Sequence, residues 1–264
     1  MERYTEAERL EWIQEQMDAL IQDSPVKVFA ASNSPLIPFR LTNAKNYRPN
    51  HGYRARELIL DSGVGMETDN GHVISAALKM GDCVDWVVPK DYPNRTMETI
   101  ESLKEFKLHM PDSLQHKLLI PLQGSTPEEY VECYNQAREI FPDQEYFGFG
   151  GIAGAALTTV PNLQPLPRRM EAVRYLLDHT DVKQLHLFGC TNIQWLNLYQ
   201  DERIVSCDSA RFGQQAKTDA FYGKHGGVMS YFAIAAEWVK FLTHLVNPDQ
   251  TRSDEISFDG FFEH

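Results

Sequence analysis

The amino-acid sequence predicts an α/β fold in which parallel strands alternate with helices. Short apolar runs typical of buried strands are separated by longer helical patterns, and polar or glycine residues directly follow several of the runs. Seven predicted strands in 264 residues suit a (β/α)8 TIM barrel, either with one strand unrecognised or in a compact, incomplete form. A doubly wound open sheet is the alternative.

The individual elements follow from apolar periodicity and from the residues that begin and end helices. Strands are predicted at residues 26–30, 57–60, 83–88, 117–120, 146–148, 184–188 and 204–207, and helices at 96–106, 127–140, 167–178, 193–200 and 228–245. Residues 1–17 are charged and amphipathic, which favours a further helix over a signal peptide. No repeat, low-complexity tract or Gly/Ser linker interrupts the chain, so a single domain over residues 1–264 is expected.

Composition excludes several classes of protein. The net charge is 25 − 37 = −12, so a nucleic-acid partner requires a local basic patch rather than a generally basic surface. No run of 18 apolar residues exists, and no membrane span is expected. Patterns of zinc peptidases (HExxH), P-loop nucleotide triphosphatases and α/β-hydrolases (GxSxG) are all missing from the sequence.

The cysteines carry no metal-binding spacing. Cys83, Cys133, Cys190 and Cys207 are scattered without a CxxC pair, which predicts free thiols in a reducing cytoplasm and no structural zinc site. No cofactor is expected from any other pattern. The glycine-dense segment 148–154 is a weak match to a dinucleotide fingerprint, but three prolines between residues 155 and 167 make a poor phosphate-facing helix.

Residues able to do chemistry follow the predicted strands one set at a time. They are Asp61 with Ser62, Asp91, Gln123, Gly150 with Gly151, and Asp208. Parallel barrels build their active sites from the carboxyl ends of their strands, so we expect these residues to converge. Each also has a purely structural interpretation, as a turn aspartate, a loop glutamine or a turn glycine.

In this order the segments resemble the tRNA-guanine transglycosylase superfamily, TIM-barrel enzymes that exchange guanine for a 7-deazaguanine across an N-glycosidic bond. The resemblance covers roughly residues 57 to 211 and rests on Asp-Ser-Gly after a strand, an acid after the next strand, Gln-Gly, Gly-Gly-Ile-Ala, and a strand that ends in aspartate. It implies that Asp208 is the nucleophile that attacks ribose C1′, and that Asp61 is the acid/base. It also implies that Asp91 binds the guanine edge, with Ser62 nearby, and that Gln123 and the amides of Gly150 and Gly151 hold the O6 side.

Three departures from the family pattern refine the resemblance. No cysteine follows Cys207, although the tRNA enzymes carry a Cys/Cys/Cys/His zinc site there; Gly154-Ala155 replaces a Gly-Glu pair; and the segment after Asp208 is short. The chain therefore looks most similar to the compact, DpdA-like branch that inserts 7-deazaguanines such as preQ0 into DNA. DNA is thus favoured over tRNA as the partner.

A basic and aromatic stretch at residues 43–56 precedes the strand that ends in Asp61. It includes Lys45, Arg48, Arg54 and Arg56, and Arg211 could extend it. Such residues suit phosphate contacts and base stacking, although a solvated loop explains them equally well.

Two other functions remain open. The chain could be a non-catalytic binding subunit that partners an active chain, although the presence of both Asp61 and Asp208 argues against this. Association as a homodimer or with a partner subunit is left open. It could instead be a barrel enzyme for a small phosphorylated metabolite, with the glycine-rich segment 223–227 as its phosphate loop.

Overall fold

The strands of the computed structural model form one sheet, in which every pair of neighbouring strands is parallel. The structure describes residues 6–32, 34, 36–45, 55–63, 67–151, 166–190, 201–213 and 228–247. The strands are β1 (Lys27–Ala31), β2 (Phe39–Asn43), β3 (Glu57–Asp61), β4 (Trp86–Val87), β5 (Ile120–Leu122), β6 (Tyr146–Phe149), β7 (Gln184–Leu187) and β8 (Ile204–Ser209).

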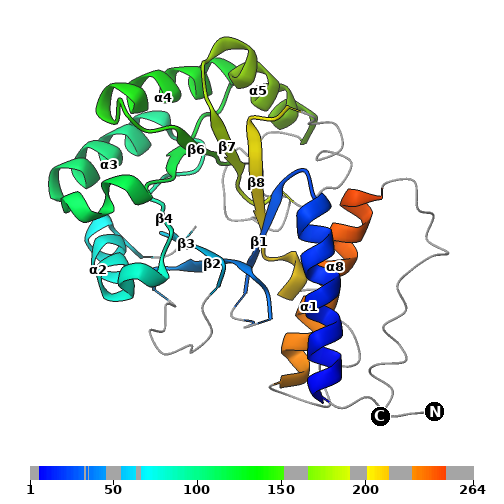
Figure 1. Ribbon diagram of the computed structural model, residues 1–264. Coiled ribbons are helices and arrows are strands. Elements are labelled where there is room, and N and C mark those ends of the chain that lie inside the picture. The colour runs from blue at the N-terminus through cyan, green and yellow to red at the C-terminus, as the bar shows by residue number, and fades with distance from the viewer. Residues whose placement is uncertain are drawn as a thin grey trace.

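The strand order is that of a barrel opened at one seam. It runs β4-β3-β2-β1-β8-β7-β6-β5, so β1 lies between β2 and β8 and each other strand lies beside its sequence neighbour. The sheet curls strongly (Figure 1). Its edge strands meet through one parallel bridge, between Val87 and Leu118, and the Leu119 amide donates to the Val87 carbonyl at 3.1 Å. The sheet is therefore TIM-like and curled without being closed by a continuous ladder. A doubly wound sheet, whose strand order reverses at its centre, does not fit.

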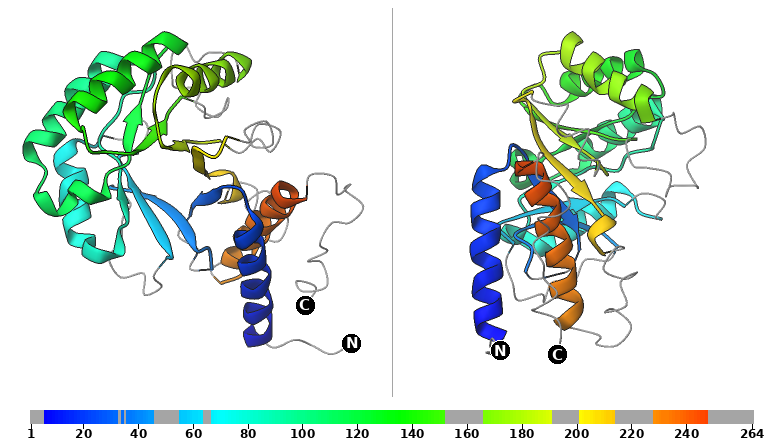
Figure 2. Two further views of the ribbon diagram at one scale, coloured as in Figure 1. Left: turned by 45° about the horizontal axis from the view of Figure 1, so that its top comes forward. Right: turned by 90° about the vertical axis from the view of Figure 1, so that its right-hand side faces the viewer.

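The helices lie outside this curled sheet. They are α1 (Glu6–Asp23), α2 (Asn70–Met80), α3 (Thr96–His109), α4 (Pro127–Ile140), α5 (Leu166–His179) and α8 (Val228–Val246), with short 3₁₀ turns at Gly81–Cys83 and Asp112–Lys117. Figure 1 shows α2, α3, α4 and α5 following one another around the outer face. Helices α1 and α8 lie side by side in both figures and pack together at the other side of the sheet (Figure 2). None of the described helices is long and apolar enough to cross a membrane.

Local chemistry explains where these helices begin. At α4 the Thr126 hydroxyl accepts from the Glu129 amide at 3.3 Å, Pro127 occupies the first turn, and Glu128 and Glu129 complement the helix dipole, as the sequence predicts. At α2 the Asp69 carboxylate caps the His72 amide at 2.8 Å. Helix α8 is fastened to β1 by the fully buried Trp238, whose indole donates to the Val28 carbonyl at 2.9 Å.

Most predicted strands are confirmed to within two residues, but those predicted at 83–88 and 117–120 begin three residues too early. The side chain of Asp85 accepts from the Leu58 amide at 2.8 Å, so regular pairing of β4 begins only at Trp86. Lys117 ends a 3₁₀ turn and donates to the carbonyls of Gly81 and Val84, so β5 starts at Ile120. The sequence interpretation missed β2 and α2 altogether, and the predicted helix at 193–200 lies outside the described residues.

Candidate functional site

The carboxyl ends of the strands carry the residues that the sequence singles out. Asp61 ends β3, Gln123 directly follows β5, Gly150 directly follows β6, and Asp208 is the penultimate residue of β8. Asp91 lies four residues beyond β4 and joins the group through a hydrogen bond with Gln123. Because the strands are all parallel, these positions share one edge of the sheet.

Asp91 is the centre of a buried polar cluster. Its Oδ2 accepts from Gln123 Nε2 at 2.5 Å, and its Oδ1 accepts from Ser62 Oγ at 3.5 Å. Burial raises the pKa of Asp91, while the hydrogen bond from Gln123 and the charge of Lys90 oppose part of that rise. All of these side chains are at least nine-tenths buried, so the carboxyl group is held in a fixed orientation.

Hydrogen bonds to its side chain and to its backbone orient Gln123. Its Oε1 accepts from the Asn94 amide at 3.2 Å, and its backbone carbonyl accepts from Thr96 Oγ1 at 2.9 Å. Asn94 adopts a left-handed backbone (φ 60°), which asparagine tolerates better than most residues. Since Oε1 is the acceptor, Nε2 is the atom that faces Asp91.

The glycines after β6 make room for Gln123 and shape the adjoining turn. A Cβ on Gly150 would lie 2.0 Å from Gln123 Nε2, and Gly151 has a φ of 75°. Tyr130 donates to the Gly150 carbonyl at 2.9 Å, and Arg169 donates to the Gly151 carbonyl at 3.1 Å. The Gly150 amide itself donates to the Leu122 carbonyl at 3.0 Å. The Gly150 amide is therefore already engaged in pairing with the end of β5.

Asp208 lies in β8, which pairs with β1 and β7. Its Oδ1 accepts from the Gly189 amide at 2.8 Å and lies 3.2 Å from His186 Nε2. His186, in β7, is fully buried and pairs in register with Ser206 of β8. Although it bonds directly to the predicted nucleophile, sequence reasoning gave His186 no role, because a lone histidine in an apolar strand has no distinguishing spacing.

Asp61 has a strongly perturbed acidity. Burial, followed by the charges of Asp91 and Asp208, raises its pKa from 3.8 to about 7, while the amides of Gly63 and Ser62 oppose the rise. Its Oδ2 accepts from the Gly63 amide at 3.2 Å. A carboxyl group with this acidity exchanges a proton readily near neutral pH, as a general acid or base requires.

Lys90 and Tyr130 also lie at the carboxyl ends of the strands, and neither was expected there from the sequence. Lys90 is buried and donates to the Gly63 carbonyl at 3.4 Å, next to Asp61 and Ser62. The Tyr130 ring stacks on Phe149 with centroids 3.9 Å apart, which places its hydroxyl against Gly150. The adjacency of Lys90 to Asp91 in the sequence was the one signal that could have found the lysine.

The described basic residues that were expected to contact nucleic acid lie at opposite ends of the sheet. Lys45 is exposed just beyond β2, where the Ala44 amide donates to the Asp61 carbonyl at 2.8 Å, and the exposed Arg211 follows β8. Both lie at the carboxyl edge. Arg56 precedes β3 at the opposite, amino end of the sheet and forms an ion pair with Asp18 of α1. Arg48 and Arg54 lie outside the described residues.

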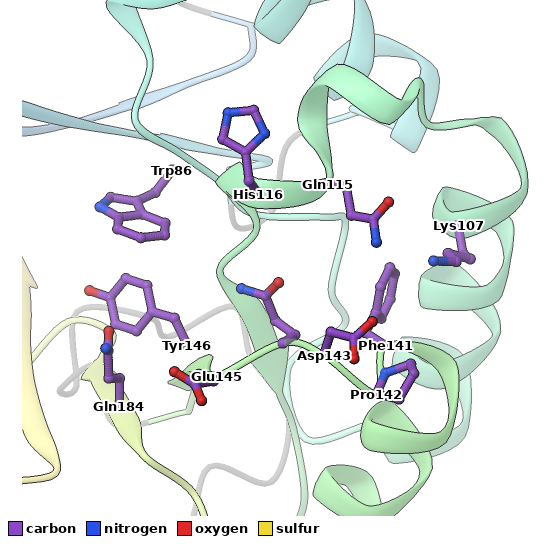
Figure 3. A pocket seen from close by; sticks show the side chains of 11 residues that line it. Trp86, Lys107, Gln115, His116, Phe141, Pro142, Asp143, Glu145, Tyr146 and Gln184 are labelled. Carbon is purple, nitrogen blue, oxygen red and sulfur yellow. The ribbon is translucent and has the colours of Figure 1, made fainter.

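A separate cavity of about 550 Å³ opens at the amino ends of β4, β6 and β7 (Figure 3). Trp86 and Tyr146 lie together there, with ring centroids 4.7 Å apart, and Glu145, Gln184 and His116 line the same opening. This cavity is at the far end of the strands from Asp61 and Asp208. Among the described residues, no group of three or more His, Cys, Asp or Glu side chains is placed to hold a metal ion.

Comparison of the sequence with known protein families and with curated proteins finds no match. The chemistry of this site therefore has to be argued from its own geometry.

Proposed function

We propose that the protein is a base-exchange transglycosylase that replaces guanine in a nucleic acid with a 7-deazaguanine through a covalent glycosyl-aspartate. The observation that carries the proposal is the arrangement of Asp61, Asp91 and Asp208 at one edge of a TIM-like parallel sheet, each in a different setting. Exchange at a glycosidic bond requires a nucleophilic carboxylate, a proton donor for the leaving base and a group that recognises that base. We also take the curled sheet to be a compact TIM barrel.

Asp208 is the proposed nucleophile. Its oxygen attacks C1′, the bond from C1′ to guanine N9 breaks, and the leaving base takes a proton from Asp61. In the second half, the incoming 7-deazaguanine returns a proton to Asp61 as its N9 attacks C1′, which releases the Asp208 carboxylate. A pKa of about 7 suits Asp61 to both steps, because the group is populated in both protonation states near neutral pH.

Asp91 is proposed to recognise the base. A carboxylate accepts hydrogen bonds only, so it matches the adjacent N1–H and amino group of guanine. Gln123 and the Gly151 amide are proposed to hold the O6 side, with Ser62 and Lys90 supporting the carboxylate. The buried Asp91–Gln123 contact at 2.5 Å supports this assignment because it preorganises the acceptor before the base arrives.

The polymer is proposed to cross the carboxyl edge, where Lys45 and Arg211 are exposed. The target nucleotide must leave its stack to reach Asp208, as in other enzymes that act on a base. DNA remains the favoured polymer because the sequence has no cysteine after position 207 for the zinc site of the tRNA enzymes.

Exchange of labelled guanine tests the proposal. The protein is incubated with radiolabelled guanine or a 7-deazaguanine and with duplex DNA, single-stranded DNA or tRNA, and label in the polymer is counted. Incorporation that disappears in Asp208→Asn supports the proposal. If no polymer takes up label while a sugar phosphate binds in a parallel titration, the metabolite-enzyme alternative replaces it.

A further inference from the structure

A chain of buried hydrogen bonds links Tyr146, the first residue of β6, to Asp208. Tyr146 Oη lies 2.5 Å from Ser206 Oγ, which lies 2.7 Å from His186 Nδ1, and His186 Nε2 lies 3.2 Å from Asp208 Oδ1. Tyr146 belongs to β6, His186 to β7, and Ser206 and Asp208 to β8, so the chain crosses three neighbouring strands. None of these contacts is needed to complete a sheet ladder.

With Asp208 ionised and His186 neutral, the chemistry of the four groups gives the chain one direction. An ionised Asp208 only accepts, so His186 Nε2 carries a proton and donates it. In a neutral imidazole Nδ1 then accepts from the Ser206 hydroxyl, and Ser206 Oγ accepts in turn from the Tyr146 hydroxyl. Every donor in the chain is used once, which is the arrangement that buried polar groups require.

Packing holds the imidazole in that plane. His186 has no exposed surface, and its ring meets the edges or faces of Phe188, Phe29 and Tyr146 at centroid distances of 4.6, 5.9 and 6.5 Å. Gly148, the register partner of His186, makes room for Phe188, since a Cβ there would lie 2.2 Å from the Phe188 ring. A ring enclosed on several sides cannot flip without moving its neighbours.

Both hydrogen bonds that the described residues give to the Asp208 carboxylate end on Oδ1. We infer that His186 is a positioning residue that, together with the Gly189 amide, fixes Oδ1 and leaves Oδ2 as the oxygen that attacks C1′, while Tyr146 and Ser206 select the Nε2–H form of the imidazole. This inference rests on the proposed function for the identity of the reaction. The hydrogen-bond arrangement itself does not depend on it.

Two substitutions at His186 separate the donor to Asp208 from the partner of Ser206. In His186→Gln the side-chain amide reaches the place of Nε2 and keeps a donor for Asp208. In His186→Asn the shorter side chain reaches only the place of Nδ1, so it keeps a partner for Ser206 and leaves Asp208 without that donor. We expect kcat for guanine exchange to fall about 100-fold in the Asn variant and less than about 10-fold in the Gln variant. KM for the polymer should change little in either, because neither side chain contacts it.

A spectroscopic measurement of the tautomer of His186 does not depend on activity. Long-range ¹H–¹⁵N correlation of the histidine ring reports which nitrogen is protonated, and the signal is assigned by its loss in His186→Gln. We expect the Nε2–H form, with a ring-nitrogen shift that moves in Asp208→Asn. An Nδ1–H tautomer would overturn the inference outright.

The outcomes distinguish the inference from the proposed function. Equal exchange rates in the Gln and Asn variants, in an active enzyme, contradict a positioning role for His186 and leave the proposed function standing. An Nε2–H tautomer coupled to Asp208 in a protein that exchanges no base supports the contact and overturns the proposed function. If the Asn variant does not fold, Tyr146→Phe takes its place, and an unchanged tautomer and rate in that variant contradict the role given to Tyr146.

Discussion

Strand β3 carries one carboxylate at each end, and the two have different hydrogen-bond partners and neighbouring charges. At the amino end Glu57 accepts from Lys27 Nζ at 2.5 Å and from Trp86 Nε1 at 3.2 Å, so a cation and an indole compensate its charge. At the carboxyl end Asp61 accepts from the Gly63 amide and faces the charges of Asp91 and Asp208. These two positions lie four residues apart in one strand and so face the same side of the sheet.

The difference distinguishes Glu57, whose charge is compensated within the fold, from Asp61, whose acidity is perturbed. A carboxylate that serves the fold is paired where it sits, as Glu57 is. Asp61 is half-buried and faces like charge, which costs stability and raises its pKa. Perturbed pKa values of this kind cluster at functional sites, and the active sites of parallel barrels lie at the carboxyl ends of their strands.

Loss of the acid/base is expected to have the largest effect. Asp61→Asn removes the proposed proton donor for the leaving base and should slow guanine exchange by about 10²- to 10⁴-fold. Glu57→Gln is the matched control at the other end of the strand and should remain near the wild-type rate. Rates are measured with labelled guanine at saturating polymer; a strong effect of Glu57→Gln with none of Asp61→Asn would reverse the comparison.

The substitutions Asp61→Asn and Glu57→Gln should change the free energy of unfolding in opposite directions. Between pH 4 and pH 7 folded Asp61 holds a proton that the unfolded chain has released, so stability falls as pH rises through this range. Asp61→Asn should therefore be more stable than wild type by roughly 2 to 4 kcal/mol at pH 8, and the gain should shrink towards zero near pH 4.

Glu57→Gln weakens the contact with Lys27, which is about half exposed, and should cost less than about 1 kcal/mol at pH 8. Denaturant titrations of both variants at pH 4, 6 and 8 measure these differences. A pH-independent effect of Asp61→Asn contradicts the raised pKa.

A methyl group at Gly150 tests whether the base-binding cluster is as tightly assembled as its contacts indicate. In Gly150→Ala the new Cβ displaces the Gln123 amide and breaks its 2.5 Å bond to Asp91. Guanine affinity, measured by calorimetry, should fall about 10- to 100-fold. Gly213→Ala is the control, because a Cβ there meets nothing within 4 Å; equal affinities for the two variants would remove Gln123 from base recognition.

The smallest expected effect concerns the polymer. Lys45→Ala combined with Arg211→Ala should flatten the log–log salt dependence of DNA binding by about one to two units, near one for each lost phosphate contact. Arg56→Ala, at the amino end and paired with Asp18, should leave the slope unchanged. The reverse result would place the polymer at the other end of the sheet.

Much of this architecture is readable from the sequence because apolar runs and helix caps are local signals. The β2 strand escaped notice because a buried arginine, Arg40, interrupts its apolar pattern. The α2 helix was readable from its Asp69 cap and its buried Val73, Ile74 and Ala77, but it opens with Asn-Gly, a pair more typical of turns.

Only part of the candidate site could be predicted from the sequence, for a different reason. Asp61, Gln123 and Asp208 stand out because they directly follow or end apolar runs. The roles of His186, Ser206 and Tyr146 arise from contacts between strands up to 60 residues apart, such as Tyr146 with Ser206. No spacing within one strand encodes such a contact, so only the fold reveals the chain that ends at Asp208.

Trapping the covalent intermediate tests the central claim most directly. The protein is incubated with a DNA oligonucleotide or tRNA without free base, denatured, digested and analysed by mass spectrometry for a peptide that carries a sugar-linked nucleotide. The account predicts an adduct on the peptide containing Asp208, absent in Asp208→Asn and preserved in Asp201→Asn, which alters an aspartate before the amino end of β8. An adduct that persists in Asp208→Asn, or base exchange at the wild-type rate by that variant, would contradict it.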